Sequence, residues 1–229
     1  MTTISTNLQA VKQRIVQAAN AAVRPADQVH LLAVSKTWPA EAVRDAFQAG
    51  QTAFGESYLQ EALAKIEALR DLPLQWHFIG PIQSNKTRAI AEHFDWVHSI
   101  DRLKVAERLS EGRPKGLAPL NVCLQVNISG ETTKSGVAIA QVATLAKAVQ
   151  ALPHLALRGL MAIPKETTDY ALQREQFKML KLLFDQLNAE GLQLDTLSMG
   201  MSHDLEAAIV EGATIVRVGA AIFGTREKH

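Results

Sequence analysis

The chain has 229 residues, and its 24 lysines and arginines nearly balance its 23 acidic residues. This balance is too even for the broad basic surface that nucleic-acid binding requires, so a small-molecule partner is expected. No stretch approaches the roughly 18 consecutive apolar residues of a membrane span, and residues 1–8 show no signal-peptide pattern, which favours a cytoplasmic protein. The single cysteine, Cys123, lies in a mostly apolar run and is expected to be a buried core thiol.

Short apolar runs alternate with longer segments of helical periodicity, a pattern typical of repeated βαβ units around a parallel sheet. A first helix is expected at about residues 5–22. Eight strands are predicted, at residues 29–35, 51–55, 74–79, 95–100, 120–127, 156–162, 194–199 and 214–218. Helices with apolar residues at three- and four-residue spacing are predicted between them, at residues 39–49, 59–69, 101–110, 139–152 and 173–190.

Eight parallel strands with right-handed crossovers predict a closed (β/α)8 barrel of the TIM type, with an open doubly wound sheet as the alternative. The chain ends soon after the eighth strand, so a single domain over residues 1–229 is expected. Active-site groups of such barrels lie where strands end and βα loops begin. Polar residues at strand ends are therefore the candidates for function.

Lys36 ends the first strand, directly after an apolar run and Ser35. An ammonium group there is poorly hydrated unless it has a partner or a covalent role, although an ordinary surface lysine is the alternative. Burial lowers a lysine pKa and makes a free amine available for Schiff-base chemistry with aldehydes.

The seventh and eighth strands lead into segments rich in small residues, at 198–203 and 219–224. In α/β barrels these two loops often bind a phosphate through backbone N–H groups and a helix N-terminus. Arg217 lies within the apolar run TIVRV, where a cation needs a partner. Either a structural ion pair or a ligand contact would satisfy it.

Other kinds of site find little support. Residues 127–136 have the Gly, Lys and Ser of a nucleotide phosphate loop, but Thr133 stands where that loop needs glycine, so a lid or a partner-contacting loop is predicted instead. The histidines are scattered without metal-ligand spacing, and no G-x-S-x-G elbow is present. We predict neither a metal site nor a hydrolytic triad.

Seven motifs occur in order along the chain: AVSKT around Lys36, FGESY at 54–58, WHFIGPIQSNKTR at 76–88, NISGETTKSG at 127–136, RGLMAIP at 158–164, LSMGMSHDLEAAI at 197–209 and VRVGAAIFG at 216–224. With these motifs the whole chain resembles the YggS/PROSC family of pyridoxal phosphate homeostasis proteins. The resemblance implies a fold type III barrel like the N-terminal domain of alanine racemase, without the C-terminal β domain, that binds pyridoxal 5′-phosphate (PLP).

The resemblance also implies a set of cofactor-binding residues, which are Lys36, Ser57, His77, Met199, Gly200, Ser202, Arg217, Gly219 and Ala220. In it, Lys36 holds the cofactor as a Schiff base, Arg217 faces the pyridine nitrogen, and Ser202, Gly219 and Ala220 hold the phosphate. Three positions depart from the family, which usually has Asn at Ser57, Asp at His203 and Thr at Ala220. Loss of the threonine hydroxyl removes one phosphate hydrogen bond, worth roughly 0.5–3 kcal/mol.

The resemblance favours a monomeric PLP carrier that helps balance vitamin B6 and amino-acid pools, has no strong catalytic activity, and could supply PLP-dependent apoenzymes. No catalytic residue is assigned. An amino-acid racemase is the alternative, and a barrel enzyme unrelated to PLP is a third hypothesis. Racemisation needs acid–base groups on both faces of the cofactor, which racemases complete with a tyrosine through a two-domain dimer. This chain has only Tyr58 and Tyr170 and lacks the second domain.

Overall fold

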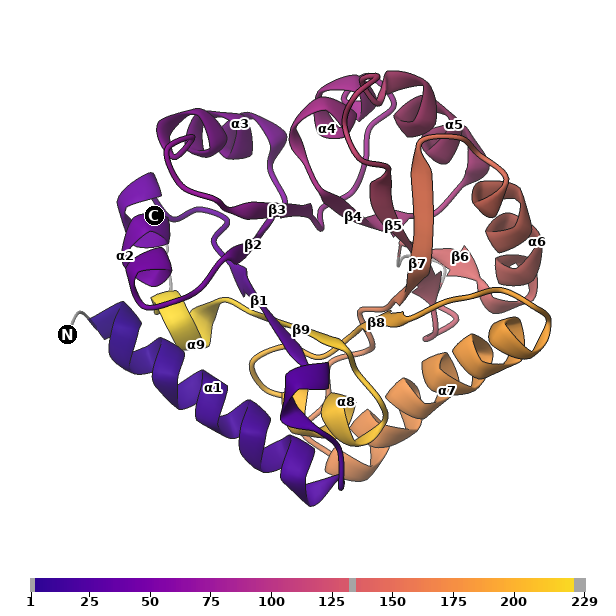
Figure 1. Ribbon diagram of the computed structural model, residues 1–229. Coiled ribbons are helices and arrows are strands. Elements are labelled where there is room, and N and C mark those ends of the chain that lie inside the picture. Colours follow the sequence, from indigo (N-terminus) through magenta and orange to yellow (C-terminus); the bar gives the residue numbers. More distant parts are fainter. Residues whose placement is uncertain (1–2, 132–134, 225–229) are drawn as a thin grey trace.

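The computed structural model describes residues 3–131 and 135–224 and shows a ring of parallel strands surrounded by helices (Figure 1). The strands follow the order β4-β3-β2-β1-β9-β8-β7-β5, and pairing between β4 and β5 closes the ring. The predicted closed barrel is therefore confirmed, and the open doubly wound sheet is wrong.

All eight predicted strands are present, with ends that differ from the predicted ones by at most two residues. They are β1 His30–Val34, β2 Ala53–Glu56, β3 Gln75–Phe78, β4 Trp96–Ile100, β5 Leu120–Asn127, β7 Leu155–Met161, β8 Thr196–Ser198 and β9 Ile215–Val218. A two-residue strand that the sequence did not predict, β6 Val137–Ala138, pairs with the end of β5 outside the ring.

Helices cover the outside of the barrel (Figure 1). Six were predicted: α1 Thr3–Ala21, α2 Ala40–Gln48, α3 Leu59–Ala68, α5 Leu103–Gly112, α6 Ile139–Gln150 and α7 Tyr170–Ala189. Three further short helices are α4 Thr87–His93, α8 Leu205–Val210 and α9 Ala220–Phe223, and a 3-10 turn spans Ala26–Gln28. No helix within the described ranges is long and apolar enough to cross a membrane.

Helix α1 fixes the loops that follow the last two strands of the ring. The Arg14 guanidinium donates to the Glu206 carboxylate on α8 and to the Ser202 carbonyl oxygen. The Asn7 amide donates to the Ile222 carbonyl oxygen on α9. The helix that precedes the barrel therefore holds in place the segments in which the sequence predicts a phosphate site.

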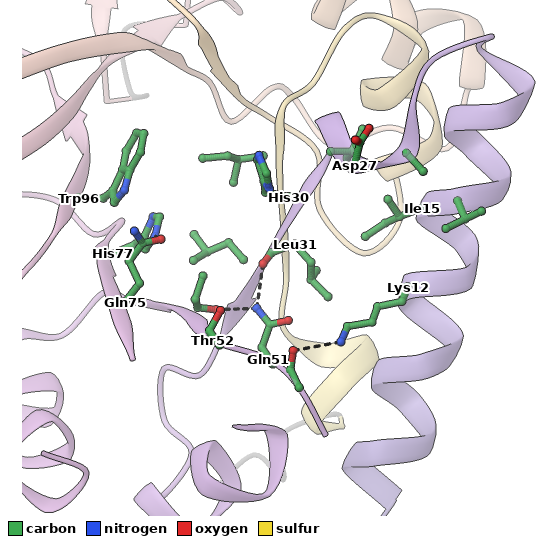
Figure 2. A pocket seen from close by; sticks show the side chains of 17 residues that line it. Lys12, Ile15, Asp27, His30, Leu31, Gln51, Thr52, Gln75, His77 and Trp96 are labelled. Carbon is green, nitrogen blue, oxygen red and sulfur yellow. Dashed lines mark hydrogen bonds between the residues drawn. The ribbon is translucent and has the colours of Figure 1, made fainter. Parts of the chain in front are cut away.

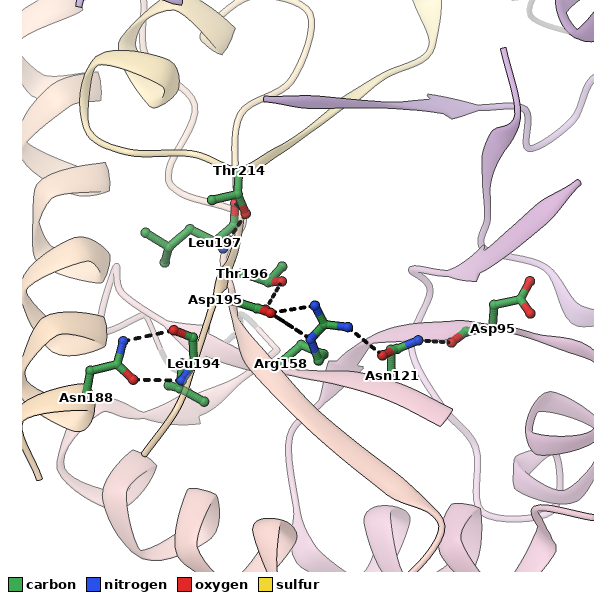
Figure 3. Close-up of polar contacts among 9 residues, drawn as sticks. All are labelled: Asp95, Asn121, Arg158, Asn188, Leu194, Asp195, Thr196, Leu197 and Thr214. Atoms are coloured by element: carbon green, nitrogen blue, oxygen red, sulfur yellow. Dashed lines mark hydrogen bonds and ion pairs between the residues drawn. The ribbon is translucent and has the colours of Figure 1, made fainter. Parts of the chain in front are cut away.

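The amino ends of β4, β5, β7 and β8 are tied together by a polar network (Figure 3). Arg158 donates to both carboxylate oxygens of Asp195 and to Asn121 Oδ1, and the Asn121 amide donates to the Asp95 carbonyl oxygen. The guanidinium carbon of Arg158 also lies 5.1 Å from the centre of the Trp96 ring. This network stabilises the amino end of the barrel, opposite the predicted site.

The single cysteine is a core thiol, as predicted. Cys123 is fully buried and forms a small apolar cluster with Trp96 and Met161. Burial raises the pKa of Cys123 to about 12. The thiol is therefore protonated at neutral pH and is a poor nucleophile.

Candidate functional site

A cavity of about 570 Å³ lies at the carboxyl ends of the strands. We call it the carboxyl-end cavity, and its lining consists of Val34, Lys36, Trp38, Ser57, Ile79, Ile163, Met201, Ser202, His203, Arg217, Gly219, Ala220 and Gly224. These residues follow or end β1, β2, β3, β7, β8 and β9. The cavity thus lies at the end of the barrel where the sequence predicted function.

Lys36 lies in the turn after β1, between two residues that donate hydrogen bonds to carboxylates. Ser35 is fully buried, and its hydroxyl donates to Glu56 Oε1 over 2.6 Å. Thr37 has a positive φ of 69°, and its backbone N–H donates to Glu61 Oε1. Both neighbours of Lys36 are therefore fixed by carboxylates, which restricts the backbone that carries its amine.

The two carboxylates share a buried cation, Lys65 of α3, and we call Ser35, Glu56, Glu61 and Lys65 the Lys65 cluster. The Lys65 ammonium donates to Glu56 Oε1 over 2.7 Å, to Glu61 Oε1, and to the Ser35 carbonyl oxygen over 2.7 Å. Burial raises the pKa of Glu56, while its bonds to Lys65 and Ser35 act in the opposite direction. The cluster was not predicted, although Lys65 follows Leu59 and Ala62 at three-residue spacing on the buried face of α3.

Arg217 lies on β9, the strand that pairs with β1, where it lines the cavity and is 4% exposed. Its Nη1 donates to the Ser198 carbonyl oxygen (2.6 Å) and to Ser198 Oγ (2.8 Å), and its Nη2 donates to the Ala162 carbonyl oxygen (2.9 Å). No carboxylate of the described residues forms an ion pair with it. Of the two alternatives left by the sequence, the structural ion pair is thus not found. Three of the five guanidinium N–H groups are used, which leaves two for another acceptor.

The segment from β9 into α9 presents backbone at the cavity wall. Ile222 and Phe223 both donate their N–H groups to the Gly219 carbonyl oxygen, which starts the helix. A Cβ atom on Gly219 would lie 3.1 Å from the Val34 carbonyl oxygen, so a larger residue would crowd β1. Ala220 is exposed at the start of α9. This is the geometry expected of a loop that brings its backbone close to a ligand.

Met199 and Gly200 shape the loop after β8 but are not part of the cavity lining. Met199 is buried and donates its N–H to the Ile215 carbonyl oxygen. Gly200 has φ +92°, and a Cβ there would lie 2.6 Å from Ala208 Cβ. Its carbonyl oxygen accepts from the Arg217 N–H. These two residues support the site through its backbone.

His77 lies inside the barrel, below the carboxyl-end cavity. It lines a second cavity, of about 630 Å³, whose wall includes His30, Gln75, Trp96 and Ile215 at the amino ends of strands (Figure 2). We call this the amino-end cavity. The His77 ring stacks on Trp96 with ring centres 5.4 Å apart. His77, which the resemblance implies to be a cofactor-binding residue, therefore does not line the carboxyl-end cavity.

The structure brings together most of the predicted residues. Six of the nine line the carboxyl-end cavity, namely Lys36, Ser57, Ser202, Arg217, Gly219 and Ala220. The apolar wall formed by Trp38, Ile79 and Ile163 was not predicted. Tyr58 is 54% exposed and does not line the cavity. Residues 132–134, in the loop predicted to be a lid, lie outside the described residues.

The model of the alanine racemase N-terminal domain matches residues 6–227. The chain belongs to this family. Within the family, it is 63% identical to the pyridoxal phosphate homeostasis protein of Pseudomonas aeruginosa, over 99% of this chain and 97% of that protein. It is 50% identical to the protein of the same name from Escherichia coli K12, over 99% and 98% of the two chains. The resemblance inferred from the seven motifs is confirmed.

Solved structures of the family have the same barrel. PipY of Synechococcus elongatus, solved with PLP bound, is 38% identical to this chain with a TM-score of 0.85. The match covers 96% of this chain and 100% of PipY. A protein from Bifidobacterium adolescentis described as unknown gives a TM-score of 0.91 at 35% identity, over 96% and 94% of the chains. Alanine racemase of Corynebacterium glutamicum shares the fold at 19% identity and a TM-score of 0.68, and only 59% of that chain is covered.

Proposed function

We propose that this barrel binds PLP in the carboxyl-end cavity and serves in intracellular PLP homeostasis. The observation that carries the proposal is that Lys36 and Arg217 line one cavity, in a chain whose 63% identical relative is named a pyridoxal phosphate homeostasis protein. PipY, with the same fold, was solved with PLP bound.

The residues of the cavity fit a phosphorylated aromatic ring. Its volume of about 570 Å³ lies within the range of small-molecule sites, roughly 300–1,000 Å³. Val34, Ile79 and Ile163 supply apolar walls, while Lys36 and Arg217 supply an amine and a hydrogen-bond donor. The close approach of Gly219 to the Val34 carbonyl oxygen leaves backbone, and no side chain, at one wall.

Each residue has a distinct task in this proposal. The Lys36 amine would form the Schiff base by condensing with the cofactor aldehyde, and this condensation releases one water molecule. Ser202, Gly219 and Ala220 bind the phosphate, mainly through N–H groups, because Ala220 has no hydroxyl to offer. Ser57 contributes a short polar side chain at the same wall. PLP supplies a reactive aldehyde and an electron-withdrawing ring.

Arg217 favours storage of the cofactor over chemistry on amino acids. Burial lowers the pKa of Arg217 to about 10, so the guanidinium remains protonated at neutral pH and can only donate. A pyridine nitrogen facing it accepts that hydrogen bond and stays unprotonated. The ring is then a weaker electron sink for carbanions, which disfavours decarboxylation and transamination of a bound amino acid. The exposed Tyr58 offers no second acid–base group in the cavity lining.

The finer parts of the function rest on the same relatives. We propose a cytoplasmic monomer that keeps PLP bound and passes it to PLP-dependent apoenzymes. The near-neutral charge balance of the chain supports a small-molecule partner and argues against a nucleic acid.

Borohydride reduction tests the proposal, because it converts a Schiff base into a stable secondary amine. We expect peptide mass spectrometry of the reduced protein to place the adduct on Lys36 and to find none in Lys36→Ala. Lys178→Ala, which changes an exposed lysine of α7, is the matched control and keeps the adduct. An undiminished adduct in Lys36→Ala refutes the assignment, and turnover of alanine enantiomers at about 1 s⁻¹ or faster refutes the carrier function.

A further inference from the structure

A chain of polar side chains crosses the barrel interior from the amino-end cavity to the carboxyl-end cavity. It joins Gln75 Oε1 to His77 Nε2 (3.0 Å), His77 Nδ1 to His98 Nε2 (2.9 Å), His98 Nδ1 to Ser198 Oγ (2.7 Å), and Ser198 Oγ to Arg217 Nη1 (2.8 Å). The residues come from β3, β4, β8 and β9, and all but Gln75 are at most 4% exposed. Figure 2 shows the end of this hydrogen-bond chain at the amino-end cavity, where Gln75 and His77 lie beside each other.

The two ends of this chain impose the same direction on every hydrogen bond. A guanidinium can only donate, so Ser198 Oγ accepts from Arg217. The Gln75 carbonyl oxygen can only accept, so His77 Nε2 carries a hydrogen. A neutral imidazole has one N–H, and His77 Nδ1 therefore accepts from His98 Nε2. His98 Nδ1 in turn accepts the Ser198 hydroxyl hydrogen, and every donor in the chain has one acceptor.

This pairing of each donor with one acceptor would be lost if either histidine were charged or carried its hydrogen on Nδ1 in place of Nε2. An extra hydrogen on His98 Nδ1 would leave the Ser198 hydroxyl hydrogen without an acceptor within the chain. An extra hydrogen on His77 Nδ1 would place two hydrogens between the rings. Burial lowers the pKa of His77 to about 3 and that of His98 well below its ordinary value, and the charge of Arg217 contributes to the second shift. Both rings are therefore neutral at physiological pH.

We propose that Ser198 and His98 are positioning residues for Arg217, and that Gln75, His77, His98 and Ser198 form a fixed one-way hydrogen-bond chain beneath it. With its hydrogen turned to His98, Ser198 Oγ always presents a lone pair to the guanidinium. Together with two carbonyl oxygens, this acceptor holds Arg217 in one orientation at the cavity wall. The effect on PLP rests on the proposed function, whereas the protonation pattern of the two histidines does not.

NMR of the whole protein tests the direction of the chain without any cofactor. Long-range ¹⁵N–¹H correlation spectra distinguish the two neutral tautomers of histidine and the charged form. We expect His77 and His98 both to be neutral with the hydrogen on Nε2 at pH 7.5. Their signals are assigned by their loss in His77→Asn and His98→Asn. A hydrogen on Nδ1 of either ring overturns the proposal.

Two substitutions of His98 test the effect on Arg217. His98→Leu removes the acceptor for the Ser198 hydroxyl, and we expect PLP to dissociate about tenfold faster. His98→Asn keeps an oxygen near the Nδ1 position, and we expect it to restore dissociation to within about threefold of the wild-type rate. Equal dissociation rates in the Leu and Asn variants refute a positioning role. His93→Leu, on the surface of α4, is the control and leaves the rate unchanged.

A separate variant covers the case in which His98→Leu does not fold. Ser198→Ala removes the hydroxyl but keeps the carbonyl oxygen that also accepts from Arg217, and it too is expected to release PLP faster. Wild-type retention in Ser198→Ala, with PLP still attached to Lys36, overturns the proposal. If the wild-type protein forms no adduct at Lys36 while its histidines show the expected tautomers, the proposed function fails and the hydrogen-bond chain stands.

Discussion

Replacing Lys65 with methionine is expected to destabilise the barrel strongly. Methionine keeps most of the length and apolar contact of the lysine stem but removes the ammonium group. Glu56 is fully buried, and without Lys65 its Oε1 keeps only the Ser35 hydroxyl as a donor. Its Oε2 has no hydrogen-bond partner among the described residues even in the wild-type protein. The variant therefore leaves a carboxylate in the core without its cation.

The size of the loss follows from burial. Removing one partner of a buried ion pair typically costs about 3–5 kcal/mol, because the remaining charge cannot be rehydrated. The Lys65 and Glu56 side chains are 5% and 0% exposed, so this range applies to the free energy of unfolding. Lys147→Met is the matched control, since Lys147 pairs with Glu190 on the surface and is 59% exposed. Loss of that pair should change the free energy of unfolding by no more than about 1 kcal/mol.

The loss in free energy of unfolding caused by Lys65→Met should also grow as the pH rises. Burial raises the folded-state pKa of Glu56 above its unfolded value, and loss of Lys65 raises that pKa further. The folded protein then binds more protons at Glu56 than the unfolded chain. Stability from this group is present below the unfolded pKa and is lost as the pH rises through the folded pKa. Lys65→Met should therefore be closest to wild type near pH 5 and furthest from it at pH 8.

Urea unfolding at pH 5 and pH 8 measures both effects. A second variant, Glu56→Gln/Lys65→Met, neutralises the buried carboxylate while keeping an acceptor for Ser35, and it should recover much of the stability lost at pH 8. A deficit below about 1 kcal/mol at pH 8 would refute the reasoning. So would a deficit that does not depend on pH, because the uncompensated charge would then not be its cause.

Two further predictions concern acid stability and the phosphate. Burial lowers the pKa of His77 from 6.5 to about 3, so the stability it contributes is present above pH 6.5 and is lost as the pH falls towards 3; at pH 5 the loss should reach about 2 kcal/mol. Urea unfolding should show a shallower decline from pH 6.5 to 5 in His77→Gln than in wild type or in the exposed control His203→Gln, and equal slopes would contradict the prediction. Ala220→Thr adds a hydroxyl at the start of α9 and should tighten PLP binding about tenfold in equilibrium dialysis, whereas an unchanged Kd would indicate that the phosphate does not lie beside Ala220.

The barrel was predictable because eight apolar runs and five intervening amphipathic segments are long enough to show their periods. The elements that were missed are the short ones. Helix α9 has four residues and α8 has six, less than two helical turns, so periodicity cannot identify them. The two residues of β6 form a strand only because β5 lies beside them. Tertiary contacts, and not local pattern, decide these elements.

Most residues that line the candidate site could be predicted from the sequence, but the buried residues beneath it could not. Lys36 and Arg217 stood out as cations at or near the ends of apolar strands, and the family motifs supplied most of the remaining lining. The residues beneath the cavity gave weaker signals. His98 and Ser198 are polar residues in strands that are otherwise mostly apolar, which indicates a buried partner without naming it. That His77 faces the amino-end cavity depends on the layer of the barrel it occupies, which strand alternation alone does not give.

The barrel interior contains buried polar side chains whose hydrogen bonds converge on one cation, Arg217. The interior of such barrels is usually filled by layers of branched apolar side chains. Here His77, His98, Ser198 and Arg217 occupy part of that interior, and each polar group would destabilise the fold if left unpaired. The hydrogen bonds that satisfy them form one continuous chain, and that chain ends on the guanidinium that lines the carboxyl-end cavity. In the proposed binding mode, with the ring nitrogen of PLP against Arg217, this interior would present a fixed donor to that nitrogen and would make the ring a weaker electron sink for carbanions. The polar core thus fits the proposed role of holding the cofactor, since every hydrogen bond in it leads to the side chain proposed to contact the ring.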